Sequence, residues 1–178
     1  MSFFIQAGAP RSLPVRSEED EAPWDAMESV FPLHGEHAVL VWNHIPILLS
    51  YKYDLSFMVE DLLLIIEELQ SRHSGELTNH WVSNNFAHEW RFEWSDNRLT
   101  IESKWGEIGN GLDELLRRSG PVTLDIEAFM GEWKRVLGNV VEALRQAGHE
   151  EAESEEMTRL VKVWSSIEAE GILYPSNE

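Results

Sequence analysis

HEWRFEWSDNRLTIESKW, residues 88–105, is the stretch that decides the fold. Apolar and charged side chains alternate on both sides of Asp96 and Asn97, as in two half-buried strands of a hairpin. A two-residue loop at these positions fixes the register. It places the following residues opposite each other: Trp94 and Leu99, Phe92 and Ile101, His88 and Trp105, Arg91 and Glu102, and Glu89 and Lys104. A shift by one residue would set aromatic side chains against charged ones, so this register is strongly favoured.

A second hairpin is predicted upstream of this stretch. Residues 38–42 and 45–51 are short β-rich runs, and the turn-prone pair Asn43 and His44 separates them. Both runs are apolar on both faces, although Pro46 removes one hydrogen-bond donor. We therefore expect this hairpin to lie centrally in a sheet that is covered on both sides.

Three main helices are predicted from apolar residues that recur with helical spacing. The first runs from Asp54 or Ser56 to about Arg72, the second from about residue 126 to residue 147, and the third follows Ser154 and ends at Gly171. Shorter elements are a helix over residues 112–118 and a strand over residues 122–124.

Residues 1–36 differ in character from the rest of the chain. They contain four prolines and an acidic run at residues 18–21, which predicts an irregular N-terminal segment with room for one short helical turn. The remaining residues, 37–178, are expected to form a single α+β domain, with a small antiparallel sheet of two hairpins packed against the three main helices.

The chain is strongly acidic and contains no cysteine. Its 14 basic and 32 acidic residues give a net charge of −18, which disfavours both nucleic acids and anionic membrane surfaces as partners. Such a field would attract a cationic protein, and the alternative is that the acidity serves only solubility. Without cysteine, a disulfide, a thiol nucleophile and a thiolate zinc site are excluded. No secretory signal or membrane span is evident, so we expect a cytoplasmic protein.

Candidate chemistry in the sequence is weak. His34 and His37 are close together, but glycine and proline surround them and no rigid element holds a metal-ligand spacing. The polar residues Asn79, His80, Asn84, Asn85 and His88 could supply a general base and amide donors. We expect a solvated loop there instead, and neither a catalytic residue, a metal nor a cofactor. Two alternatives stay open: an enzyme, such as a hydrolase, that uses these residues, and a regulatory domain with a ligand cavity lined by tryptophans.

Two acidic patches contain the residues that we expect to bind a partner. On the first predicted helix, Phe57 and Leu64 project into an acidic stripe, so they are either buried by a further layer or exposed as the centre of a docking patch. The second patch precedes and begins the last helix, where some of the charge also suits the helix dipole. The predicted binding residues are Phe57, Glu60, Asp61, Leu64, Glu67, Glu68, Glu150, Glu151, Glu153, Glu155 and Glu156.

Three stretches together resemble a known group of proteins: YKYDLSFMVEDLLLIIEEL, the tryptophan hairpin HEWRFEWSDNRLTIESKW, and PVTLDIEAFMGEWKRVLGNVVEAL. In general character, residues 37–170 resemble the small acidic immunity proteins of bacterial polymorphic-toxin and contact-dependent growth inhibition systems. The resemblance implies a cytoplasmic, non-enzymatic inhibitor that binds a cognate toxin domain. With the acidic charge, it suggests a cationic nuclease whose active site is blocked. The partner-binding face, the toxin and the oligomeric state stay open.

Overall fold

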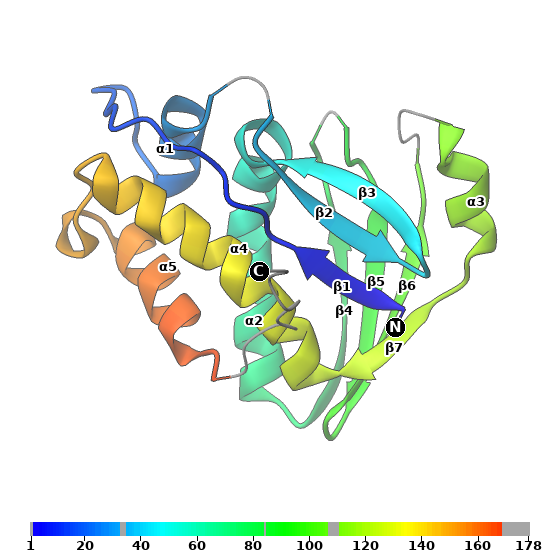
Figure 1. The fold of residues 1–178 in the computed structure, drawn as a ribbon. Coiled ribbons are helices and arrows are strands. Elements are labelled where there is room, and N and C mark those ends of the chain that lie inside the picture. Colours follow the sequence, from blue (N-terminus) through cyan, green and yellow to red (C-terminus); the bar gives the residue numbers. More distant parts are fainter. Residues whose placement is uncertain (1, 33–34, 84, 107–110, 169–178) are drawn as a thin grey trace, which may run out of the picture.

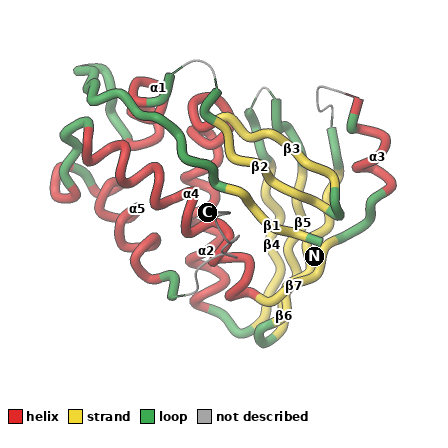
Figure 2. Tube along the Cα trace, viewed as in Figure 1, coloured by secondary structure: helices red, strands yellow, loops and turns green. Residues whose placement is uncertain are grey.

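The computed structural model describes residues 2–32, 35–83, 85–106 and 111–168, and it has an α+β fold with two antiparallel sheets (Figures 1 and 2). The strands are β1 Phe3–Gln6, β2 His37–Trp42, β3 Ile45–Ser50, β4 Ser74–His80, β5 Glu89–Ser95, β6 Arg98–Lys104 and β7 Val122–Asp125. The helices are α1 Pro23–Val30, α2 Ser56–Ser71, α3 Asp113–Arg118, α4 Ile126–Gln146 and α5 Glu155–Ser166. None of these helices combines the length and apolar content that a membrane span requires.

The larger sheet has the strand order β4-β5-β6-β7 and contains the predicted tryptophan hairpin. The predicted register is confirmed along the β5–β6 ladder, where Trp94 lies opposite Leu99 and Arg91 lies opposite Glu102. Asp96 has a positive φ of 52°, which suits the tight turn that joins the two strands. The apolar side chains of β5 are buried and its charged side chains face outward, as the alternation indicated.

The smaller sheet has the order β1-β2-β3, and its β2–β3 hairpin turns at Asn43 and His44 as predicted. The predicted central, doubly covered position is wrong for β3, which is an edge strand with Leu48 57% exposed. The central strand is β2, which pairs with β3 on one side and with β1 on the other. Edge placement also accounts for Pro46. Proline has no backbone N–H, and an edge strand tolerates this because one of its two sides has no pairing strand.

The N-terminal segment is more ordered than the sequence indicated. Where the sequence predicts an irregular segment with room for one short helical turn, residues 1–36 contain strand β1 and the two-turn helix α1, and residues 7–22 contain neither helix nor strand. Contacts distant in sequence hold β1 in place: it pairs with β2, and the backbone N–H of Ile5 donates to Glu132 Oε2 on α4 at 2.7 Å. Phe3 packs against aromatic rings of both sheets. The local sequence of residues 1–36 does not indicate these contacts, because the partners lie elsewhere in the chain.

Aromatic side chains form the contact between the two sheets. In Figure 1 the β1–β3 sheet lies in front of the β4–β7 sheet, and α2, α4 and α5 gather beside them. The Trp42 ring centroid lies 5.2 Å from that of Trp90 and 5.0 Å from that of Trp105. These rings join the sheets, because Trp42 comes from β2, Trp90 from β5 and Trp105 from the residue directly after β6. They belong to the buried hydrophobic core.

Candidate functional site

The outer stripe of α2 exposes two large apolar side chains. Phe57 is 49% exposed and Leu64 is 45% exposed. The rest of the helix packs broadly inward, because it contacts α1, α4, α5 and β4 and buries its remaining apolar side chains. Of the two possibilities for this pair, burial by a further layer and exposure, the structure has exposure.

Carboxylates flank the two apolar side chains on both sides of the helix. Glu67 forms a bidentate ion pair with Arg159 of α5. Arg159 Nη2 lies 2.7 Å from Glu67 Oε2, and Arg159 Nε lies 3.1 Å from Glu67 Oε1. On the other side, Asp61 Oδ2 accepts from Asn79 Nδ2 of β4 at 3.3 Å. Glu60 is exposed and has no ion pair with any described residue. The stripe therefore has an apolar centre and an acidic rim.

The second predicted patch is a short turn at Glu151–Glu153 followed by the first turn of α5. Ser154 caps the helix, as predicted, by accepting from the backbone N–H of Met157 at 3.0 Å. The next two residues, Glu155 and Glu156, lie in the first turn, where carboxylates favourably meet the helix dipole.

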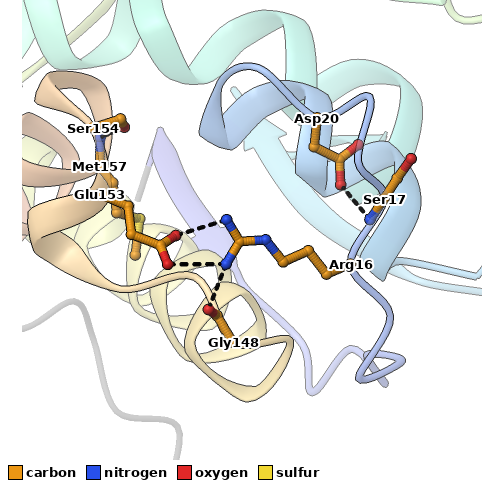
Figure 3. Close-up of polar contacts among 7 residues, drawn as sticks. All are labelled: Arg16, Ser17, Asp20, Gly148, Glu153, Ser154 and Met157. Carbon is orange, nitrogen blue, oxygen red and sulfur yellow. Dashed lines mark hydrogen bonds and ion pairs between the residues drawn. The ribbon is translucent and has the colours of Figure 1, made fainter.

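Arg16 holds one side of this second patch to the N-terminal segment (Figure 3). Its guanidinium donates to Glu153 at 3.0 Å and to the carbonyl of Gly148 at 2.9 Å. The hydrogen bond from Arg16 lowers the pKa of Glu153, and the guanidinium balances the negative charge of this carboxylate. Glu151 has a weaker partner in Arg145 at 3.9 Å.

The two patches form one surface, because α5 packs beside α2. At their junction lies a cavity of about 460 Å³ whose described lining includes Glu67, Arg159 and Glu155. We call the surface made by the eleven predicted binding residues the α2–α5 acidic face. Within the described parts of the chain, five of its carboxylates have no ion pair: Glu60, Asp61, Glu150, Glu155 and Glu156.

The polar cluster considered for catalysis does not form a common site in the described residues. His88 is 4% exposed, and its Nδ1 accepts from the backbone N–H of Gly106 at 2.8 Å. Burial lowers the pKa of His88 to about 4. His80 instead lies at the exposed end of β4, with Nδ1 3.7 Å from Glu89 Oε2. Asn85 is also exposed, and Asn84 lies outside the described residues.

The metal hypothesis finds no set of ligands in the structure either. His37 is an exposed residue at the start of β2, and His34 lies outside the described residues. Across residues 2–32, 35–83, 85–106 and 111–168, no group of three or more His, Cys, Asp or Glu side chains could hold a metal ion.

Sequence reasoning missed the cations that divide the acidic face. Arg159 lies 92 residues from Glu67 in the chain, and Arg16 lies 137 residues from Glu153. No local pattern pairs residues so far apart. The unpaired carboxylates around Phe57 and Leu64 are the features that a partner would meet. No protein-family model, no curated protein and no solved structure matches this chain, so its own geometry carries the functional argument.

Proposed function

We propose that this protein is an immunity protein that binds a cognate, cationic toxin domain through the α2–α5 acidic face. The observation that carries the proposal is the exposure of Phe57 and Leu64 inside an acidic rim. Protein interfaces commonly place apolar anchors at the centre and polar groups around them. Solubility alone would account for the carboxylates, but it gives no reason to expose two large apolar side chains among them.

The charge distribution supports a cationic partner. Five carboxylates of the face lack an internal ion pair in the described residues, and the whole chain carries a net charge of −18. Such a field accelerates encounter with a basic surface and raises specificity against acidic ones. A nuclease toxin has a basic active site that receives phosphates. Carboxylates placed over that site would occupy it and block the substrate.

The proposal places the protein in the cytoplasm, where an incoming nuclease would act, and assigns it a stoichiometric role without a catalytic residue, metal or cofactor. In the described residues, the histidines weighed for catalysis lie in separate environments. This separation favours the inhibitor over the hydrolase hypothesis.

Charge reversal on the acidic face tests the proposal. The tagged wild type, incubated in its native cytoplasm, should retain a basic protein that elutes as salt is raised. The variant Glu60→Lys/Glu150→Lys should lose this protein, because both carboxylates are unpaired and exposed. The matched control is Glu93→Lys/Glu127→Lys, which reverses two exposed carboxylates on β5 and α4.

Two outcomes would contradict the proposal. One is retention of the same protein by the Glu60→Lys/Glu150→Lys variant and the control alike. The other is a retained partner that is acidic. The gene adjacent to this one gives an independent check, since the proposal expects it to encode a toxin whose purified domain binds the wild type.

A further inference from the structure

A second feature lies away from the acidic face, where strand β1 meets helix α4. The two elements and Trp164 of α5 line an open pocket of about 730 Å³, within the size range of small-molecule sites. We call it the β1–α4 pocket. Its described lining residues are Ile5, Gln6, Ala7, Gly8, Ala9, Lys134, Arg135, Gly138, Asn139 and Trp164.

The charge of this pocket is opposite to that of the protein. Lys134 and Arg135 are half-buried neighbours on α4, and neither forms an ion pair within the described residues. None of the described lining residues is acidic. In a chain with more than twice as many acidic as basic residues, most arginines pair with a carboxylate, as Arg16, Arg72 and Arg159 do. Two adjacent unpaired cations in one pocket therefore stand out as an anion site.

Trp164 adds an aromatic wall. Its ring has the guanidinium of Arg145 at 5.8 Å from its centroid, and its indole N–H has no hydrogen-bond partner in the described residues. Gly138 lies directly beside it, because a Cβ atom at that position would come within 3.2 Å of Trp164 Nε1. A larger residue there would crowd the indole N–H.

Hydrogen bonds hold the walls of the pocket in position. Glu132 Oε2 accepts from the backbone N–H of Ile5 at 2.7 Å, and Asn139 Nδ2 donates to the hydroxyl of Tyr51 at 2.8 Å. The same amide approaches the carbonyl oxygens of Ala7 and Gly8 at 3.4 Å. The bonds to Ile5, Ala7 and Gly8 join β1 and the residues after it to α4, so ligand binding should need little reorganisation of the pocket.

We propose that the β1–α4 pocket binds a small anion that carries an aromatic ring and is about the size of a mononucleotide. A phosphate or carboxylate group would pair with Lys134 and Arg135, and the ring would lie against Trp164. This site is independent of the toxin-binding proposal, since it uses α4 and β1 and none of the eleven residues of the acidic face.

Titration of the purified protein by NMR tests the site with defined probes. The probes are AMP for the phosphate, indole-3-acetate for the carboxylate, and adenosine as the neutral half of AMP. The indole N–H resonance of Trp164, assigned from its loss in Trp164→Phe, is the readout. We expect AMP or indole-3-acetate to shift this resonance with saturation, and adenosine to bind at least about tenfold more weakly than AMP.

Two variants separate charge from access. Lys134→Ala/Arg135→Ala should weaken the anion about tenfold or more, whereas Lys162→Ala, a control at another helical lysine without an ion pair in the described residues, should leave it unchanged. Gly138→Ala keeps both charges but crowds the indole N–H, so it should weaken binding without loss of thermal stability.

Three outcomes would overturn the proposal. The first is that neither AMP nor indole-3-acetate shifts the Trp164 resonance. The second is that Lys134→Ala/Arg135→Ala binds as the wild type does, and the third is that adenosine binds as tightly as AMP. Retention of the toxin by Lys134→Ala/Arg135→Ala is a separate measurement. Failure of the pocket proposal is therefore distinguishable from failure of the toxin-binding proposal.

Discussion

The aromatic contact between the two sheets and the α2–α5 acidic face both use large apolar side chains, but to different ends. Trp42 and Trp90 are fully buried and touch each other across the two sheets. Phe57 and Leu64 are about half exposed and lie on a helix face with carboxylates on both sides. In the first region apolar area is removed from water by folding itself, whereas in the second it remains to be removed by a partner. Stability and binding should therefore respond to different substitutions.

The largest effect on stability is expected at Trp90. Trp90→Ala leaves a large void between the sheets and should lower the free energy of unfolding by about 4 kcal/mol. The contrasting variant Phe57→Ala should change it by less than about 0.5 kcal/mol, because the side chain is already half exposed. Urea denaturation followed by circular dichroism measures both. Equal losses in the two variants would break the distinction between the regions.

A smaller effect concerns the protonation of His88 within the aromatic region. Its pKa is lowered to about 4 in the fold, while the unfolded chain has a value near 6.5, so the unfolded state binds more protons between these pH values. Neutral His88 therefore contributes roughly 3 kcal/mol above pH 6.5, and this contribution is lost as the pH falls towards 4.

The variant His88→Gln tests this pH dependence, because glutamine keeps an acceptor for the Gly106 amide but does not titrate. Between pH 6.5 and pH 4, the slope of unfolding free energy against pH should be smaller in the variant by up to about 1.4 kcal/mol per pH unit. Identical slopes in denaturation series at several pH values would show that His88 is protonated freely in the fold.

The smallest effect on stability is expected in the acidic face, at the Glu67–Arg159 ion pair. Both side chains are partly exposed, so solvent screens their attraction despite the bidentate geometry. A double-mutant cycle with Glu67→Gln and Arg159→Gln should give a coupling energy of about 0.5 kcal/mol that falls as salt is added. A coupling above about 2 kcal/mol would make this pair part of the core's stability.

The same contrast accounts for what the sequence could predict. The β5–β6 hairpin and the apolar stripes of α2 and α4 were predictable, because each element buries one face. Its apolar residues therefore recur in the sequence with the spacing of a strand or a helix. Strand β4 was not: Ser74–His80 contains a single large apolar residue, Leu77, and it was expected to be loop at its end. It is a strand because β5 supplies a pairing edge.

The candidate sites divide in the same way. Phe57 and Leu64 were identifiable because they interrupt the acidic stripe of one helix, which is a local pattern. The joining of the two acidic patches depends on α5 packing beside α2, and the β1–α4 pocket depends on residues about 130 positions apart, as in the contact of Asn139 with Gly8. Such juxtapositions follow from tertiary packing, which no periodicity encodes.

The most direct test of the account is calorimetric titration of the captured basic partner with Phe57→Ser/Leu64→Ser. The control is Leu48→Ser/Val82→Ser, which replaces two apolar side chains outside the acidic face that are somewhat more exposed than Phe57 and Leu64. We predict that the first variant keeps its melting temperature and loses at least about thirtyfold in affinity, while the control binds as the wild type does. Wild-type affinity in the Phe57→Ser/Leu64→Ser variant would contradict the claim that this face is the binding surface.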